Sequence, residues 1–495
     1  MTKFFSRYSI EFTLFVTGTV GMVLEIVGSR LLAPYFGNSI FIWTGLIGVI
    51  LGFLSLGYFL GGRLADKTAN HAGLNSLLFF AAVSVFFVFV FDKVLLPQIY
   101  WAGDIRFISV LISILLFAAP STFLGMITPY ATRLLIKEVN NAGAIIGRAY
   151  AVSTFGSIFG TFCAGFILIT LVGSEKIVLW LSLVLTVTSI FYLQKKSKNK
   201  LIIAVIFILL NLSLLIFKPN NKIVDIDTAY DRYQIIDVTA TANTRPMRYL
   251  TRTHASAESG IYTDINDDLV FDYTKFYRLA GLFNSAPKNS LVIGGGAMTQ
   301  PVDILRRYPE SHVDVVEIDR QLSQISKDYF GYVDTPNISI NIGDGRVFLN
   351  GNKKKYDFIF LDAFKSNESI PFQLTTKESL EKCSESMEPN GITFANIISS
   401  LDGSTSKFLN SEYLTFSAVF PKVYLFAVTK PLDSKLVQNY IMIGAKNKDT
   451  VLPTTTDVEL NRYLKNNISS DSRLGKGGMI LTDDFAPVEQ QLIGL

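Results

Sequence analysis

The feature that most limits the fold of this chain is a series of long apolar segments in its first 218 residues. A helix that crosses a bilayer needs about 20 mostly apolar residues. Seven segments are close to this length or exceed it, and they predict a transmembrane helical domain over 1–218: roughly 9–31, 40–62, 73–91, 106–128, 148–171, 176–193 and 200–217. The first is not expected to be a cleaved signal peptide, because it is long, has no small-residue cleavage site and is followed at once by another span.

Small residues are dense in three of these segments, for example in "STFGSIFGTFCAG". Small side chains let helices approach closely in lipid, so we expect the spans to form one bundle. Glu25 is the one acidic residue well inside a predicted span. Two interpretations of it stay open: a functional site for a cation or polar solute, and a structural pair with an arginine such as Arg30.

Basic residues indicate how the bundle is oriented. Eleven Lys and Arg residues fall on one side of the predicted spans and four on the other, which places the N-terminus in the cytoplasm. The loop "GGRLADK" agrees, since it resembles a cytoplasmic loop of major-facilitator transporters.

Composition changes after Phe217. Residues 1–218 carry 16 Lys/Arg and 7 Asp/Glu, a balance of +9, and the rest carries 29 and 34, a balance of −5. Neither part is basic enough to indicate a nucleic-acid partner. The two cysteines, Cys163 and Cys383, lie in different parts, so we expect neither a disulfide framework nor a zinc site, and no metal.

The second part reads as a soluble α/β module. Short alternating segments such as "YDRYQIIDVTA" predict a small antiparallel β domain over 219–272. Over 273–495, apolar strands alternate with helical segments, which predicts a doubly wound, Rossmann-like parallel sheet covered by helices on both faces.

Four predicted strands of this sheet end in residues suited to binding a ligand. The first ends in the turn Gly294, Gly295 and Gly296, which lets a ligand approach the backbone. The next three end at Glu317, Asp344 and Asp362. Because ligands of open parallel sheets bind beyond the carboxyl ends of the strands, we expect these residues to line one crevice, with Glu317 accepting hydrogen bonds from ribose hydroxyls.

At these residues the chain resembles the spermidine synthase family of aminopropyltransferases, within the S-adenosylmethionine methyltransferase-like fold. The resemblance covers roughly 225–400 and includes "DAFKSNESIPFQLTTKE". The whole chain resembles the membrane-fused version of that family, in which a transporter-like bundle precedes the synthase domain.

The resemblance implies roles for individual residues. It implies a catalytic proton acceptor at Asp362 and a binding site for the adenosyl co-substrate formed by Gln234, Gly294, Gly295, Gly296, Glu317, Asp344 and Gly345. The acceptor side departs from the family pattern: Ala297 replaces the usual Asp after the glycines, Tyr273 stands where a polyamine-contacting His is common, and Lys365 stands where a second Asp is usual. We therefore expect these three substrate-binding positions to favour an acceptor other than a standard diamine.

The function implied is a membrane-bound transferase of polyamine biosynthesis. It would move an aminopropyl group from decarboxylated S-adenosylmethionine, or a related group from S-adenosylmethionine, to a small amine, without a metal. Two alternatives stay open: a transferase or lyase with a non-polyamine substrate, and a nucleoside-binding transporter or sensor. The expected surroundings are the lipid bilayer of the cell membrane and a second copy of the chain in a homodimer.

The expected location carries a conflict. Seven spans with the N-terminus inside would place the soluble domain outside the cell, where S-adenosylmethionine is not expected. We give the chemistry more weight than the span count and expect a cytoplasmic soluble domain.

Overall fold

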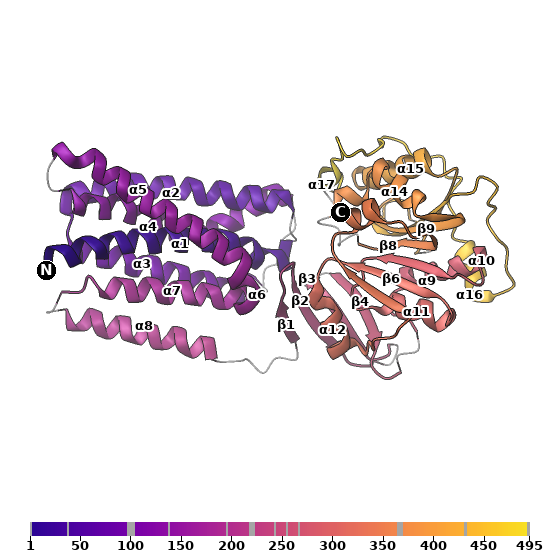
Figure 1. The fold of residues 1–495 in the computed structure, drawn as a ribbon, viewed down its shortest axis with the longest axis horizontal. Helices are drawn as coiled ribbons and strands as arrows, with labels where there is room; N and C mark the ends of the chain where they lie inside the picture. The colour runs from indigo at the N-terminus through magenta and orange to yellow at the C-terminus, as the bar shows by residue number, and fades with distance from the viewer. Residues whose placement is uncertain are drawn as a thin grey trace. The chain divides into compact units, whose positions relative to one another are not determined.

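The computed structural model of the protein describes residues 2–36, 39–96, 104–136, 139–194, 197–216, 223–241, 244–253, 256–265, 268–363, 370–429 and 433–492 (Figure 1). The chain forms two compact units, Met1–Asn221 with Ile226–Arg232 and Lys222–Asp225 with Tyr233–Leu495. Within the first unit, Arg232 of the short stretch Ile226–Arg232 forms ion pairs with Asp92 and Glu175. The predicted domain boundary at 218 stays a prediction.

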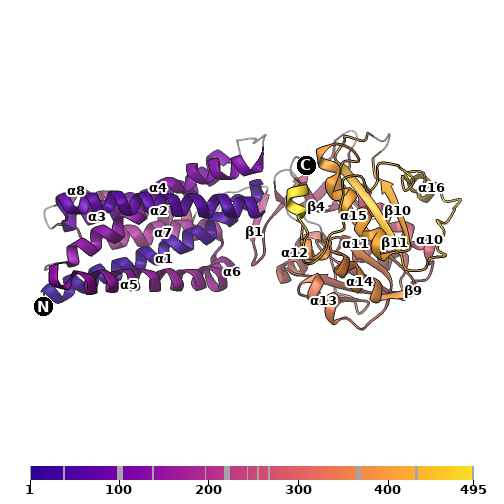
Figure 2. The same cartoon turned by 90° about the horizontal axis from the view of Figure 1, so that it is seen from above.

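The first unit is a bundle of helices that lie alongside one another (Figures 1 and 2). Its α-helices are α1 (Thr2–Phe36), α2 (Ile40–Thr68), α3 (His71–Val90), α4 (Ile105–Leu135), α5 (Ala142–Cys163), α6 (Ile169–Val172), α7 (Ser174–Ile190) and α8 (Lys198–Ile216). Within the described residues, six helical segments are long and apolar enough to cross a membrane. The predicted span 176–193 corresponds to α7, which has 17 residues and is not among the six.

Glycines set the close packing of this bundle. A Cβ atom at Gly57 of α2 would collide with the backbone of Thr122 in α4, and one at Gly156 of α5 would collide with the backbone of Phe15 in α1. These contacts are the close approach that the dense small residues predict. The predicted single bundle therefore has a direct physical basis in backbone-to-backbone contact.

The second unit contains two sheets. Four strands in the order β1-β2-β3-β4 form the smaller sheet: β1 (Ile223–Asp227), β2 (Arg232–Val238), β3 (Met247–Thr253) and β4 (Ser256–Tyr262). Strand β3 pairs antiparallel with both β2 and β4. It lies within the stretch 219–272, but most of it groups with the larger sheet, so a separate β domain there stays a prediction.

The larger sheet has seven strands in the order β10-β11-β9-β8-β5-β6-β7. Its strands are β5 (Asn289–Ile293), β6 (His312–Glu317), β7 (Ile338–Ile342), β8 (Tyr356–Leu361), β9 (Met387–Ser399), β10 (Lys422–Ala427) and β11 (Gln438–Ala445). Strands β5 to β9 are parallel, and β11 pairs antiparallel with β9, so that Gln438 lies opposite Ser399. The carboxyl ends of the parallel strands and the start of β11 thus share one edge of the sheet.

Both faces of this sheet are buried, as the continuous apolar strands predict. Leu291 and Ile293 of β5 belong to one core, which also holds residues of α13 (Gly345–Gly351), α14 (Lys377–Glu385) and α15 (Lys407–Val419). Val292 belongs to the opposite core, with residues of α9 (Asp272–Phe276), α10 (Ala280–Phe283), α11 (Thr299–Arg307) and α16 (Val458–Leu464). The remaining helices are α12 (Arg320–Phe330) and α17 (Val488–Gln491). The Rossmann-like architecture is confirmed.

Candidate active site

A glycine turn follows the central strand β5. Gly294 and Gly296 have φ values of 100° and 50°, which ordinary side chains adopt at a cost. A Cβ atom on Gly294 would also press against the backbone of Asp362 at the end of β8. The turn needs glycine for both reasons, and it brings the ends of β5 and β8 together.

The Glu317 carboxylate holds this turn in place. It accepts hydrogen bonds from the backbone N–H groups of Gly295 (2.9 Å), Gly296 (3.2 Å) and Asp319 (2.9 Å). Its side chain is 6% exposed, and burial raises its pKa while the three backbone N–H donors act in the opposite direction. The carboxylate is therefore fixed at the mouth of the turn, where further donors from a ligand can reach it.

Asp344 caps the next helix at the same edge of the sheet. Its carboxylate accepts from the backbone N–H of Val347 at 3.0 Å and from the Gln373 side chain at 3.3 Å. A Cβ atom on the following Gly345 would contact the Ile293 side chain, so glycine keeps α13 close to β5. Asp344 and Gly345 both line the cavity described below.

Asp362 follows β8, and its backbone N–H donates to Ile293 at 2.9 Å. Burial raises the pKa of its carboxyl group to about 7, and polar contacts with the Tyr277 hydroxyl and the Asn396 amide limit the rise. Within the described residues the Tyr277 hydroxyl has no hydrogen-bond partner, so its contact with Asp362 is polar without being a hydrogen bond. Burial and the charge of Asp362 raise the pKa values of Tyr273 and Tyr277 well above the ordinary tyrosine value.

One cavity of about 620 Å³ brings these groups together. Eight of the predicted site residues line it: Tyr273, Gly294, Gly295, Gly296, Glu317, Asp344, Gly345 and Asp362. It extends from the end of β7 across the glycine turn to the start of β11. The predicted convergence of strand ends on one crevice agrees with this geometry.

Three predicted positions do not join the cavity lining. The Gln234 side chain donates to Asp225 at 3.4 Å, and the neighbouring Tyr233 lines the cavity in its place. Ala297 is 2% exposed and borders a separate small pocket, while its backbone N–H donates to Ser259. Lys365 lies outside the described residues.

The cavity also contains residues that sequence reasoning missed. They include Arg252 and Glu258, which form an ion pair, and the amide side chains Gln300, Asn396, Gln438 and Asn439. Asn439 donates to Asn396 at 2.9 Å, which orders part of this wall. These residues come from β3, β4, α11, β9 and β11, and no local motif links elements so far apart in the chain.

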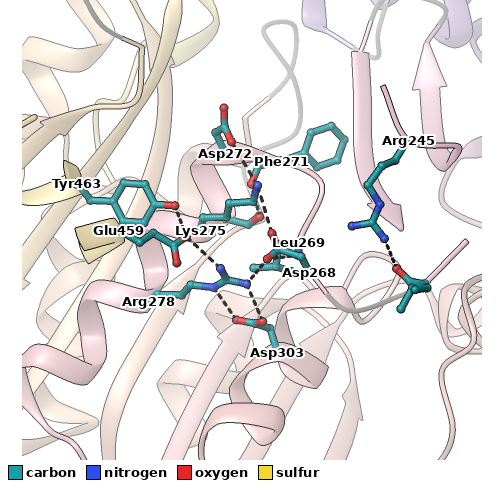
Figure 3. A network of polar contacts seen from close by, with 12 residues as sticks. Arg245, Asp268, Leu269, Phe271, Asp272, Lys275, Arg278, Asp303, Glu459 and Tyr463 are labelled. Atoms are coloured by element: carbon teal, nitrogen blue, oxygen red, sulfur yellow. Dashed lines mark hydrogen bonds and ion pairs between the residues drawn. The ribbon is translucent and has the colours of Figure 1, made fainter. Parts of the chain in front are cut away.

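An ion-pair network supports the cavity wall from behind (Figure 3). The buried Arg278 guanidinium pairs with Asp303 of α11 at 3.1 Å, with Asp268 at 2.5 Å and with Glu459 of α16 at 3.2 Å. Because Arg278 follows α9, the network ties the segment that carries Tyr273 to the helix after the glycine turn. Among the residues that the structure describes, no group of three or more His, Cys, Asp or Glu is placed to hold a metal ion.

Comparisons with known proteins point to one family. Residues 274–452 match the spermine/spermidine synthase domain family. A polyamine aminopropyltransferase of Vibrio vulnificus is 34% identical over 209 residues, covering 41% of this chain and 68% of the relative. A probable polyamine aminopropyl transferase of Bifidobacterium longum is 29% identical over 220 residues, covering 41% of this chain and 48% of the relative.

Among solved structures, a probable spermidine synthase of Corynebacterium glutamicum aligns with a TM-score of 0.40 and 23% identity. The alignment covers 47% of this chain and 83% of that protein.

The first prediction concerns Glu317. Glu317→Gln replaces one acceptor oxygen by an N–H₂ group and removes the charge, so methylthioadenosine should bind about 1.5–3 kcal/mol more weakly, the scale for a hydrogen bond to a charged group. Calorimetric titration of the purified protein measures this, with the exposed Asp328→Asn of α12 as control. Equal affinities in a folded variant would exclude Glu317 as the ribose-binding group.

Proposed function

The chain belongs to the polyamine aminopropyltransferase family and is a transferase, and from this premise we propose that it moves an aminopropyl group from decarboxylated S-adenosylmethionine to a small amine, releasing methylthioadenosine. The observation that carries the proposal is the single cavity that joins the glycine turn, Glu317 and Asp344 to the partly buried carboxyl of Asp362. Nucleoside recognition and a base thus meet at one edge of the sheet.

The nucleoside occupies the half of the cavity above β5, β6 and β7. Glu317 accepts hydrogen bonds from the ribose hydroxyls, because its position beyond β6 is the one that binds ribose in Rossmann-like folds. Gly294, Gly295 and Gly296 let the adenosyl group approach the backbone. Asp344 and Gly345 lie beside the adenine. Gln234 is not part of this proposed site, because its side chain donates to Asp225 and does not line the cavity.

The chemical step needs an uncharged attacking amine. The amine nitrogen attacks the methylene carbon beside the sulfonium, the carbon–sulfur bond breaks, and its electron pair stays on the sulfur of methylthioadenosine. Asp362 takes the proton that the amine loses. A carboxyl group whose pKa lies at about 7 suits this role near neutral pH, since the driving force for proton transfer is well matched. Tyr273, partly buried beside Asp362, orients the acceptor.

The acceptor half of the cavity, above β8, β9 and β11, differs from a diamine site. The carboxylates in the described lining are Glu258, Glu317, Asp344 and Asp362. Glu258 is paired with Arg252, and Glu317 and Asp344 lie on the nucleoside side. Asp362 alone of these four is left for the acceptor, so a second ammonium group has no carboxylate partner in the described lining. This favours an acceptor with a single amine.

We also propose that the helical unit anchors the enzyme in the cell membrane with the transferase unit in the cytoplasm. The six long apolar helical segments support a membrane anchor, and the cytoplasm is the side on which S-adenosylmethionine is expected.

Asp362→Asn keeps the shape of the side chain and removes the base. Turnover should fall by about 10²–10⁴-fold, while methylthioadenosine binding stays near the wild-type value. The wild-type rate should rise with pH through about 7, and this rise should be absent in the variant. Steady-state kinetics across pH measure both effects. If the variant turns over at the wild-type rate, Asp362 has a structural role in its loop and is not the base.

The same pKa shift predicts an effect on stability. A folded-state pKa of about 7 exceeds the unfolded value of about 3.9, so the folded protein holds the proton more tightly. The free energy of unfolding contributed by Asp362 is therefore highest below pH ~4 and declines as the pH rises to about 7. Thermal unfolding should show Asp362→Asn more stable than wild type above pH 7, with no gain from the control Asp328→Asn. If the Asp362→Asn protein were less stable than the wild type above pH 7, the ionised Asp362 carboxylate would not be destabilising and the prediction would be wrong.

The acceptor prediction uses three amines of equal chain length: putrescine, butylamine and 4-aminobutyrate. Putrescine should be no better an acceptor than the other two, because its second ammonium gains no carboxylate partner. Mass spectrometry of the products formed by the detergent-solubilised protein gives the three rates. A putrescine rate about ten-fold above the others would show that the site binds diamines after all.

The location can be tested with reporters fused to the C-terminus. A green fluorescent protein should fluoresce there, and a bacterial alkaline phosphatase should be inactive, because the first folds in the cytoplasm and the second needs an oxidising compartment. The reverse pattern would place the transferase unit outside the cell.

A further inference from the structure

Helix α11 starts directly after the glycine turn with an unfilled N-terminus. Its N-cap residue, Met298, has a φ of 59° and makes no side-chain capping bond. Pro301 has no N–H group, so the first turn offers the backbone N–H groups of Thr299 and Gln300. Within the described ranges neither N–H group meets an acceptor, and both residues line the cavity. A helix N-terminus with free N–H groups favours an anion.

The Gln300 side chain gives an independent sign of a ligand at this place. It is 6% exposed and lines the cavity, yet neither its Oε1 nor its Nε2 atom has a hydrogen-bond partner among the described residues. Buried amide groups in folded proteins are nearly always paired. An amide that is buried, unpaired and part of a cavity wall has its partner in the ligand.

The surroundings of this first turn suit a carboxylate. Ala297, just before it, carries no charge, and Asp303, one turn later, is held by Arg278. The nearby Glu317 carboxylate already accepts three backbone N–H groups. A ligand carboxylate would therefore meet the free donors of Thr299 and Gln300.

We propose that this enzyme also accepts S-adenosylmethionine itself, with the carboxylate of its methionine tail bound by the Gln300 amide and the first-turn N–H groups of α11. The inference rests on the proposed function, because the glycine turn must hold the adenosyl group for the tail to reach α11. We assign the carboxylate to the tail of the donor, because α11 begins directly after the glycine turn and its first turn therefore lies next to the proposed adenosyl site.

The reaction then transfers a 3-amino-3-carboxypropyl group. The acceptor nitrogen bonds to the methylene carbon beside the sulfonium, the carbon–sulfur bond breaks, and its electron pair stays on the sulfur of methylthioadenosine. The displaced proton passes to Asp362. The carboxylate remains on the transferred group, so no oxidant, reductant or further reactant is needed.

The test compares three ligands on the detergent-solubilised full-length protein by calorimetry. S-adenosylmethionine has the carboxylate, decarboxylated S-adenosylmethionine lacks it, and methylthioadenosine lacks the whole charged tail. Gln300→Glu places a negative charge against the carboxylate, so the affinity for S-adenosylmethionine should fall by about ten-fold or more. The affinities for the other two ligands should not fall. The same substitution at the exposed Gln324 of α12 is the matched control and should change none of the three.

Product analysis completes the experiment. Wild-type protein incubated with S-adenosylmethionine and the three amines should release methylthioadenosine and form an amine that carries the carboxylated three-carbon group. If only decarboxylated S-adenosylmethionine and methylthioadenosine bind, the inference is wrong and the proposed function stands. If none of the three ligands binds, the proposed function itself fails.

A Gln300→Glu protein that folds and binds S-adenosylmethionine as the wild type does would overturn the assignment of Gln300. Should that variant not fold, Gln300→Met keeps the volume of the side chain and removes its donors, and the same loss of affinity is expected. The wild-type comparison of the two donors remains decisive in every case.

Discussion

The buried carboxylate of Glu317, bound by three backbone N–H groups, is the interaction on which the site depends. It joins the end of β6 to the glycine turn after β5 and fixes that turn in a conformation with two positive φ angles. The turn in turn touches the backbone of Asp362 and leads into α11. A buried acceptor bound by several N–H donors is rigid, because losing any one bond leaves a buried group unpaired. The residues proposed for nucleoside recognition, for proton transfer and for binding the donor tail are therefore all positioned by this one turn.

The other half of the site contains a group, Asp362, whose ionised form is energetically unfavourable in its surroundings. Asp362 is partly buried, and its polar contacts among the described residues are the neutral Tyr277 and Asn396. Burial raises its pKa to about 7 and makes its ionised form unfavourable. The Arg278 network behind the wall is the opposite case, with a guanidinium that meets three carboxylates (Figure 3). The stability supplied by such packing and pairing lets a functional group remain in an unfavourable state.

The helical unit follows a different physical rule. Its helices approach through glycines whose missing side chains allow backbone contact, as at Gly57 and Gly156. Lipid offers no hydrophobic driving force between helices, so close packing is what a membrane bundle uses instead. The transferase sheet, by contrast, buries apolar side chains on both faces. The two parts of the chain can therefore be told apart by composition. Glycines that permit close helix contact mark the first part, and apolar strands that are buried on both faces mark the second.

The sequence by itself determined the class of each unit and the strand-end residues of the site. Apolar strands, glycines and the acids Glu317, Asp344 and Asp362 could be predicted because a parallel sheet brings the carboxyl ends of its strands to one edge. Only the tertiary structure decided the length of α7, the hydrogen bond from the Gln234 side chain to Asp225, and the burial of Ala297 away from the cavity. It also brought Gln300, Asn396 and the Arg252–Glu258 pair into one wall. Local periodicity records which face of an element is buried, but the partner that a side chain meets there depends on how elements distant in the sequence pack.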